Sequence, residues 1–269
     1  MKKKQWNGYL LGGVMITGIV FFAILLSVFW TPYDPGTMSG SQKLLAPSLQ
    51  HWLGTDNFGR DIFSRVMKGA GTTLAIAFCT VLIGGVCGIF LGSLTGYFGG
   101  RADAVLMRFN DAMTAFPSIL LGLVFVSLLG SGTFNVILAL GIVFIPSFTR
   151  VSRSAFASLR DANYVKSARL MGAGRSRILY VHMLPNTAAV LLPAVTIGFN
   201  NAVLAEASMS FLCIGVTPPD ASLGYMLSEA QGMLNAPWYV IGTGLTLVFM
   251  VFGVGLLGEG LQRRDKGVA

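Results

Sequence analysis

The sequence predicts an all-α integral membrane protein. The chain has 269 residues, of which 54% are hydrophobic and only 11% are charged, whereas soluble domains carry about a quarter charged residues. Apolar runs of about 20 residues, long enough to cross a bilayer, recur along it. Because lipid cannot hydrogen-bond to a peptide group, such runs must be helices that satisfy their own backbone. We therefore expect about six transmembrane helices.

The first two spans each carry a feature beyond hydrophobicity. Residues 9–30 follow a basic start, 1–4, and lack a signal-peptide cleavage site, so we interpret them as a retained first helix. Residues 72–97 have a glycine at every fourth position, which puts these glycines on one helix face and favours close packing against another helix. The aromatic anchors expected for the first helix are Trp6, Tyr9, Trp30 and Tyr33, and the glycines are Gly84, Gly88, Gly92 and Gly96.

The remaining spans are separated by polar or glycine-rich segments. Pro117 is predicted to kink the third span, and Pro146 to lie near the end of the fourth. A short helix is expected in the polar loop before the last span, at 222–234. The four spans are predicted at 111–129, 134–148, 186–213 and 237–257, with a short polar turn at 99–108.

A longer polar segment, residues 39–68, follows the first span. Gly54 and Gly59 indicate turns, and charges of alternating sign allow local ion pairing. Asp61 and Arg65 are four residues apart, which is a pairing distance on a helix. We predict an ion-paired surface loop with a short amphipathic helix, whose charged group is Asp56, Arg60, Asp61 and Arg65.

A basic insert, residues 150–185, separates the fourth and fifth spans. Its second part, 164–185, reads YVKSARLMGAGRSRILYVHMLP, two short helical pieces around Gly172-Ala173-Gly174 that end at Pro185. The glycines allow a sharp turn. Two helices lying on anionic lipid are one interpretation, but basic residues interrupt the apolar stripe that this needs. We favour a helix–turn–helix knob that docks into a soluble partner.

The distribution of positive charge predicts the orientation. With six spans, one side of the membrane receives both termini, the 99–108 turn and the basic insert, which together hold 15 of the 19 Lys and Arg residues. The positive-inside rule places this side in the cytoplasm. The same rule accounts for the net charge of +8, so no nucleic-acid partner is expected.

Motifs of common enzymes are missing from the sequence. There is no G-x-x-x-x-G-K-[ST] phosphate loop, no H-E-x-x-H and no G-x-S-x-G. Cys79, Cys87 and Cys213 form no C-x-x-C pair and are expected to be buried apolar residues. We predict a transport protein rather than an enzyme, with no catalytic residue, metal site or cofactor in this chain.

Glu206 is an ionisable residue deep in a predicted span. A charge at membrane depth usually faces the bundle interior or a water-filled path. One interpretation therefore makes Glu206, with Asn200 and Asn201, part of a translocation path. The other places Glu206 near the outer interface, or protonated and packed. The residues alone leave both open.

The stretch 164–185 resembles the EAA loop of the inner-membrane subunits of ABC importers. Lys166-Ser167-Ala168 stands at its Glu-Ala-Ala place, Gly172 at its glycine, and Leu184-Pro185 at its end. Lys166 replaces the glutamate of the motif, so the docking contact is expected to differ there. The resemblance implies a coupling helix seated on an ATPase, with coupling residues Ala168, Arg169, Leu170, Gly172, Ala173 and Arg175.

Other motifs are similar to those of the peptide/nickel permease family. Residues 53–65, LGTDNFGRDIFSR, look like its outside motif, and 257–261 resemble its C-terminal end. Asp56, Arg60, Asp61 and Arg65 thereby become candidate contacts for a binding protein or a gate. The short outside segment after the first span favours the C-type over the B-type subunit. A second outside loop is suggested by Ser210-Phe211-Leu212, Gly215-Val216, Pro218-Pro219, Gly224 and Met226-Leu227.

The resemblance implies a type I ABC importer fold in a bacterial inner membrane. Residues 1–71 would form the N-terminal helix and extracytoplasmic segment, and 72–269 the permease domain. Its partners would be a homologous B-type permease, two ATP-binding subunits that use ATP and Mg²⁺, an extracytoplasmic solute-binding protein and membrane lipid. The implied cargo is di- or oligopeptides, with nickel or opine-type metal chelates as the alternative. A self-sufficient channel or secondary carrier is the competing class.

Overall fold

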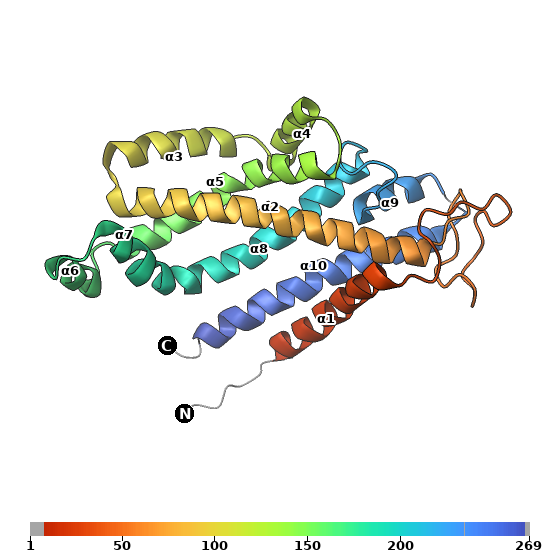
Figure 1. The fold of residues 1–269 in the computed structure, drawn as a ribbon, viewed down its shortest axis with the longest axis horizontal. Helices are drawn as coiled ribbons and strands as arrows, with labels where there is room; N and C mark the ends of the chain where they lie inside the picture. Colours follow the sequence, from red (N-terminus) through yellow and green to blue (C-terminus); the bar gives the residue numbers. More distant parts are fainter. Residues whose placement is uncertain (1–7, 234, 267–269) are drawn as a thin grey trace.

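A computed structural model describes residues 8–233 and 235–266 as a bundle of helices (Figure 1). The all-α prediction is confirmed. Three predicted features, the basic start 1–4, Trp6 and the end of the 222–234 helix at Leu234, lie outside the described residues. The elements are α1 (Gly8–Phe29), α2 (Ile62–Phe98), α3 (Gly100–Thr114), α4 (Ser118–Leu129), α5 (Thr133–Leu159), α6 (Asn163–Leu170), α7 (Arg175–Arg177), the π-helical turn η1 (Ile178–Met183), α8 (Leu184–Phe211), α9 (Leu223–Gln231) and α10 (Pro237–Lys266).

The third predicted span is broken rather than kinked. Five helices are long and apolar enough to cross a membrane, and the pair α3 and α4 makes a sixth span only if it is counted across a 90° bend. Pro117 lies at the break, and proline disfavours a helical conformation in the residue before it. The expected turn at 99–108 is confined to Gly99 and Gly100, whose φ angles are +63° and +72°, and α3 begins at once.

The predicted glycine face of α2 is confirmed as its contact with α5. A Cβ added to Gly88 would lie 2.5 Å from the Cβ of Phe148, and one added to Gly96 would lie 2.6 Å from the carbonyl oxygen of Arg153. Gly84 and Gly92 are equally close to α5. Because successive glycines of α2 contact successively later residues of α5, the two helices run parallel. Because glycine has no side chain, the backbones of these two long helices can touch along most of the bundle.

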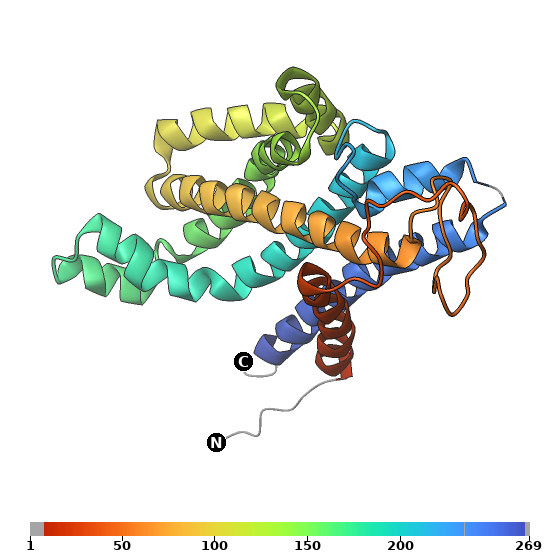
Figure 2. The same cartoon turned by 45° about the vertical axis from the view of Figure 1, so that its right-hand side comes forward.

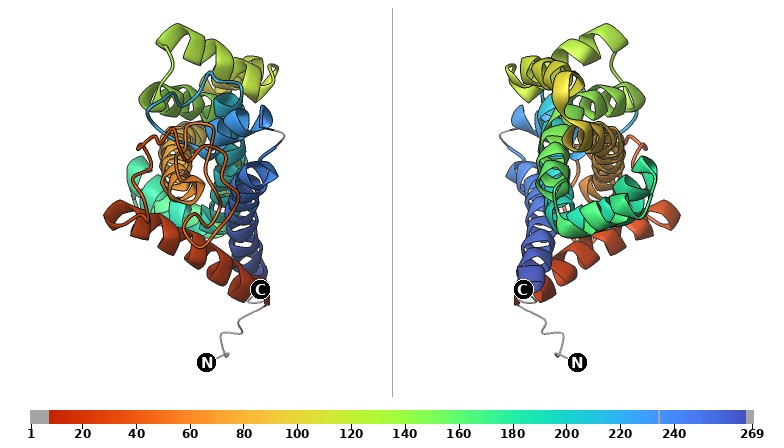
Figure 3. Two further views of the ribbon diagram at one scale, coloured as in Figure 1. Left: turned by 90° about the vertical axis from the view of Figure 1, so that its right-hand side faces the viewer. Right: turned by 90° about the vertical axis from the view of Figure 1, so that its left-hand side faces the viewer.

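The outer helices pack around this pair. α8 returns antiparallel to α5, and the side chain of Phe148 occupies the space beside Gly198. α1 lies on α10 through small residues, since a Cβ on Gly13 would be 2.5 Å from the nitrogen of Leu257. Figures 2 and 3 show α1 diverging from the rest of the bundle. Its outward apolar side chains are exposed, as suits a helix that faces lipid.

Two boundaries near the basic insert differ from prediction. Pro146 lies inside α5, which runs on to Leu159 rather than ending near Phe148. The second piece of the insert is not separate, because Arg175–Phe211 forms one long helix that passes through Pro185. The π-helical turn η1 directly precedes this proline, where the helix must do without an N–H donor.

The cysteines are less buried than predicted. Cys87 and Cys213 are exposed and Cys79 is half-buried, and all three are free. Cys79 and Cys87 lie on α2, a membrane-length helix, where an apolar side chain can face lipid instead of the protein core. Hydrophobic surroundings in the sequence therefore did not imply burial within this chain.

Candidate functional site

The knob, which we define as residues 163–183, forms the far end of the bundle (Figure 1). α6 ends in a glycine turn in which Gly172 has φ +82°. The N–H of Gly172 donates to the carbonyl of Arg169 at 3.1 Å, and that of Ala173 donates to Ala168 at 3.0 Å. This pair of bonds is the Schellman motif, which requires a left-handed residue and favours glycine. The predicted sharp corner is therefore present at Gly172.

A small core holds the knob on the bundle. Val165 and Ala168 of α6 are buried against Ile178, Leu179 and Met183, together with Phe156 of α5 and Tyr97 of α2. The tip carries the opposite kind of surface, since Leu170 is 89% exposed and Met171 is 82% exposed. Two bulky apolar side chains at a protruding tip are available to a partner. Met171 was missed by the sequence reasoning, although it directly follows Leu170.

The predicted coupling residues divide into two groups by burial. Ala168 is buried inside the knob and Ala173 is half-buried, so they shape the corner. Arg169, Leu170, Gly172 and Arg175 are exposed, and so is Lys166, the residue that departs from the EAA motif. The coupling role of these residues stays a prediction.

The opposite end of the bundle is tied together at the start of α2. The carboxylate of Asp61 caps this helix by accepting from the backbone N–H of Ser64 at 2.8 Å, and it also contacts Nδ1 of His51 at 2.9 Å. The expected pairing of Asp61 with Arg65 is therefore wrong. The capping position uses the carboxylate for the backbone, and Arg65 turns to other partners. The helix that follows is α2 itself, rather than a separate short amphipathic helix.

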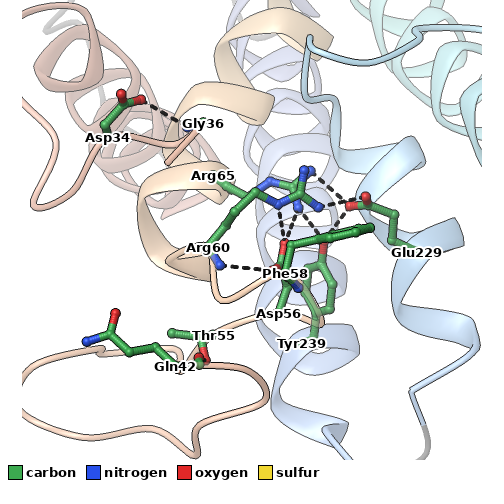
Figure 4. A network of polar contacts seen from close by, with 10 residues as sticks. All are labelled: Asp34, Gly36, Gln42, Thr55, Asp56, Phe58, Arg60, Arg65, Glu229 and Tyr239. Atoms are coloured by element: carbon green, nitrogen blue, oxygen red, sulfur yellow. Dashed lines mark hydrogen bonds and ion pairs between the residues drawn. The ribbon is translucent and has the colours of Figure 1, made fainter. Parts of the chain in front are cut away.

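The partners of Arg65 belong to an ion network, shown in Figure 4, that we call the outer network. Asp56 accepts from Arg60 at 2.6 Å and from Arg65 at 2.5 Å. Glu229 of α9 is 2.9 Å from each of the two guanidinium groups. The hydroxyl of Tyr239 in α10 donates to Glu229 at 2.8 Å. Two cations and two anions thus join the loop, α2, α9 and α10.

The outer network is buried, whereas the sequence predicted a surface loop. Asp56 is fully buried and Arg65 is 2% exposed. Burial opposes the charge of Arg60, but the carboxylates of Asp56 and Glu229 outweigh it and hold the pKa of Arg60 above its ordinary value. Glu229 and Tyr239 were missed because they lie far along the chain and no local pattern connects them to Arg65.

The loop before α2 is shaped by two left-handed glycines. Gly54 and Gly59 have φ angles of +71° and +75°, which confirms the predicted turns. A Cβ at Gly59 would fall within covalent range of the carbonyl oxygen of Ser39, and one at Gly54 would meet Leu45. The hydroxyl of Thr55 donates to the carbonyl of Gln42. The loop is therefore a packed cap on the bundle.

A hollow of about 370 Å³ lies between α4, α5 and α8, and we call it the polar hollow after the four polar side chains among its nine lining residues. Three serines and one asparagine reach it from these helices, and each carries a hydrogen-bonding group without a formal charge. Asn201 lies 10 residues before the end of α8, or about 15 Å from it, which is half the thickness of a bilayer core of about 30 Å. The polar residues are Ser118, Ser147, Asn201 and Ser208.

The three predicted path residues do not converge. Asn201 lines the hollow, but Asn200 packs beside Gly255 of α10. Glu206 is fully buried and accepts from the hydroxyl of Ser210 at 2.7 Å. The serines of the hollow were missed, although Ser118 and Ser147 each follow a proline within an apolar stretch.

Comparisons with known proteins agree with this geometry. The family described as "Binding-protein-dependent transport system inner membrane component" matches residues 88–264. The chain is 37% identical to the di/tripeptide transport system permease protein DppC of Pseudomonas aeruginosa, over 97% of this chain and 90% of that one. It is 38% identical to the glutathione transport system permease protein GsiD of Pectobacterium atrosepticum, over 97% and 89%.

The fold is also similar to solved structures. A chain of the MetNI methionine ABC transporter, in an inward-facing conformation, matches with a TM-score of 0.63 at 20% identity. The match covers 74% of this chain and 95% of that one. The predicted ABC importer permease fold is thereby confirmed.

Proposed function

This chain belongs to the family of inner membrane components of binding-protein-dependent transport systems, and we propose on that premise that it forms half of a peptide-importing pore. The names of its relatives refer to dipeptides, di/tripeptides and glutathione. These cargoes favour peptides over nickel or metal chelates for this chain. The homologous B-type permease would form the other half.

The observation that carries the coupling role is the protruding knob with its exposed apolar tip. Leu170 and Met171 stand out from a corner that the Schellman motif defines, while Val165 anchors the same helix in a buried core. A rigid knob can transmit the movement of a docked partner to the helices that carry it. That partner is an ATPase subunit, which supplies the ATP and Mg²⁺ chemistry for a non-enzymatic permease.

The polar hollow is the proposed wall of the path. An asparagine side chain that faced lipid would lose hydrogen bonds at a high cost. The face around Asn201 therefore meets water, cargo or the second permease. Because the hollow is lined by uncharged groups, it suits a peptide backbone, whose amides donate and accept hydrogen bonds. Asn200 and Glu206 would support this wall from behind.

The orientation follows from the charge distribution. The knob and both termini lie on the cytoplasmic side, and the outer network faces the extracytoplasmic solute-binding protein. Asp56, Asp61 and Arg65 are satisfied within the chain, so the surface of the loop that they hold in place, rather than their charges, would meet the binding protein.

Reconstitution tests the proposal. The chain is placed in liposomes alone, and together with its partner permease, ATPases and binding protein, and uptake of a labelled dipeptide is measured with and without ATP. We expect uptake only in the complete, ATP-supplied system. Uptake by the chain alone would instead assign it to the class of channels or secondary carriers, and ATP-driven uptake of nickel but not peptide would overturn the cargo assignment.

A further inference from the structure

A second hollow, of about 550 Å³, lies at the root of the knob. It is bounded by the last residues of α2, by the residues that follow α5, and by the two ends of the glycine turn. Three arginines from separate segments line it. The residues that matter here are Tyr97, Phe98, Arg160, Asp161, Arg169 and Arg175.

The arginines keep their hydrogen-bond donors available. The guanidinium carbon of Arg169 lies 5.8 Å from the ring centre of Tyr97, and that of Arg175 lies 5.6 Å from the ring centre of Phe98. A guanidinium that rests near an aromatic ring can still donate from the N–H groups along its edge. Within residues 8–233 and 235–266, neither arginine has a carboxylate at ion-pair distance.

The charges of this hollow do not balance within the chain. Among the described residues, the one ion pair of Arg160 is a long contact of 3.7 Å with its neighbour Asp161, whose side chain is 72% exposed. Asp103, another nearby acid, is held by Arg153 at 2.5 Å. Three cations therefore face one solvated carboxylate. The outer network shows the contrast, since there two cations meet two anions.

The length of α2 allows the hollow to lie at the depth of lipid headgroups. Lys68 is near the outer end of α2, and Tyr97 is 29 residues further along the same helix. At 1.5 Å per residue the separation is about 44 Å, close to the thickness of a bilayer with its headgroups, about 40–45 Å. Phe98 is half-exposed beside the arginines and offers them an apolar surface.

From this combination we propose that the hollow binds the phosphate group of an anionic phospholipid in the leaflet on the knob side. Arginine edges match phosphate oxygens in pairs, and basic pockets between transmembrane helices on the cytoplasmic side bind such headgroups. Free phosphate offers the same chemistry but would not use the aromatic surface. The bound lipid would connect α2 to both ends of the glycine turn and hold the knob at the membrane surface. This site is separate from the apolar tip.

Native mass spectrometry of the full-length chain tests the proposal. The purified protein in neutral detergent is mixed with phosphatidylglycerol or phosphatidylcholine of equal chain length, and the retained lipids are counted. We expect preferential retention of phosphatidylglycerol, because both lipids carry the phosphate but the choline cation of phosphatidylcholine would be repelled by the three arginines. Arg160→Gln should lower it roughly five-fold, the effect of one cation near an anionic headgroup, and Arg160→Gln with Arg175→Gln should lower it further. Arg177→Gln is the matched control, because Arg177 is exposed on α7 and does not line the hollow.

Several results would overturn the proposal. Equal retention of both lipids would show that the headgroup charge is not recognised, and an equal loss in Arg177→Gln would reduce the effect to general surface charge. Displacement by excess inorganic phosphate would make soluble phosphate the ligand. Release of the lipid by the ATPase subunit, with weaker ATPase binding in Arg160→Gln, would assign the hollow to an acidic group of that partner. The measurement involves no transport, so its failure is distinct from failure of the proposed function.

Discussion

The two ends of this bundle differ in how far their charged and apolar side chains are paired or buried within the chain. At the outer end, the charges of Asp56, Arg60, Arg65 and Glu229 are paired and buried, and they join four segments. At the knob end, apolar side chains at the tip are exposed, and the arginines at its root have no buried ion-pair partner among the residues that the structure describes. Charged groups that pair with one another within the chain favour a fixed arrangement of the segments that carry them. Exposed apolar side chains and unpaired arginines are instead available to bind another molecule.

The largest effect is expected at the outer network. Asp56→Ala would leave two guanidinium groups with one carboxylate, and removing one partner of a buried ion network costs about 3–5 kcal/mol. We expect a clear loss of thermal stability of the purified chain in detergent. Lys43→Gln, an exposed charge in the same loop, should change stability by less than about 0.5 kcal/mol. Similar losses of thermal stability in the two variants would contradict a stabilising role of Asp56 in the network.

The glycine face that connects the two ends should give the next largest effect. Gly88→Ala would bring a Cβ to 2.5 Å from the Cβ of Phe148, so α2 and α5 must separate, at a cost of about 1–3 kcal/mol. Gly85→Ala is the control, since nothing lies within 4 Å of its added Cβ. Thermal unfolding of both variants makes the comparison, and equal stabilities would show that the contact is looser than the structure indicates.

Substitutions at the corner of the knob should change stability through the backbone conformation that they require rather than through steric crowding. Gly172→Ala would force an L residue to φ +82°, at a cost of about 1–2 kcal/mol. Gly174→Ala has the same open surroundings but φ −63°, so it should be neutral. Gly172→Pro, whose ring holds φ near −65°, should still insert in the membrane but lose ATP-driven uptake. Normal uptake in that variant would refute the coupling assignment.

The smallest change in stability is expected at the tip. Leu170→Ser alters an exposed side chain and should shift stability by less than about 0.5 kcal/mol, yet it should lower ATP-driven uptake because the tip is the proposed ATPase contact. Val165→Ser, five residues earlier on the same helix but fully buried, should instead destabilise the knob. Measuring stability and uptake for both variants separates the contact surface from its support. Unchanged uptake in Leu170→Ser would place the ATPase contact elsewhere.

The parts of the fold that could be predicted depend on near neighbours. Apolar length placed the first and last spans, and the four-residue spacing of glycines predicted a packing face that α5 occupies. Gly172, Gly54 and Gly59 were expected at turns, and each has a positive φ. The errors arose where a helix continued through a residue that usually ends it. α5 passes through Pro146, and the continuous helix Arg175–Phe211 passes through Pro185.

The candidate sites could be predicted only in part, because their members come from different helices. Sequence reasoning named Arg65 but paired it with Asp61, its neighbour on the same helix, whereas the carboxylate of Asp61 caps α2. Asn200, Asn201 and Glu206 are close in sequence, yet helical rotation points them towards α10, the polar hollow and the buried interior. Proximity along a helix does not imply a shared direction.

The sequence by itself determined five of the six apolar spans, the sharp turns at Gly54, Gly59 and Gly172, and the gathering of positive charge in the basic insert. These are local properties, set by side-chain hydrophobicity, by glycine's freedom at positive φ and by the net charge of each loop. Only the tertiary structure decided that Glu229 and Tyr239 complete the outer network, that α2 and α5 run parallel in contact, and that three arginines share a hollow. Such partnerships require helices distant in sequence to lie side by side, and no local pattern specifies which helices do so.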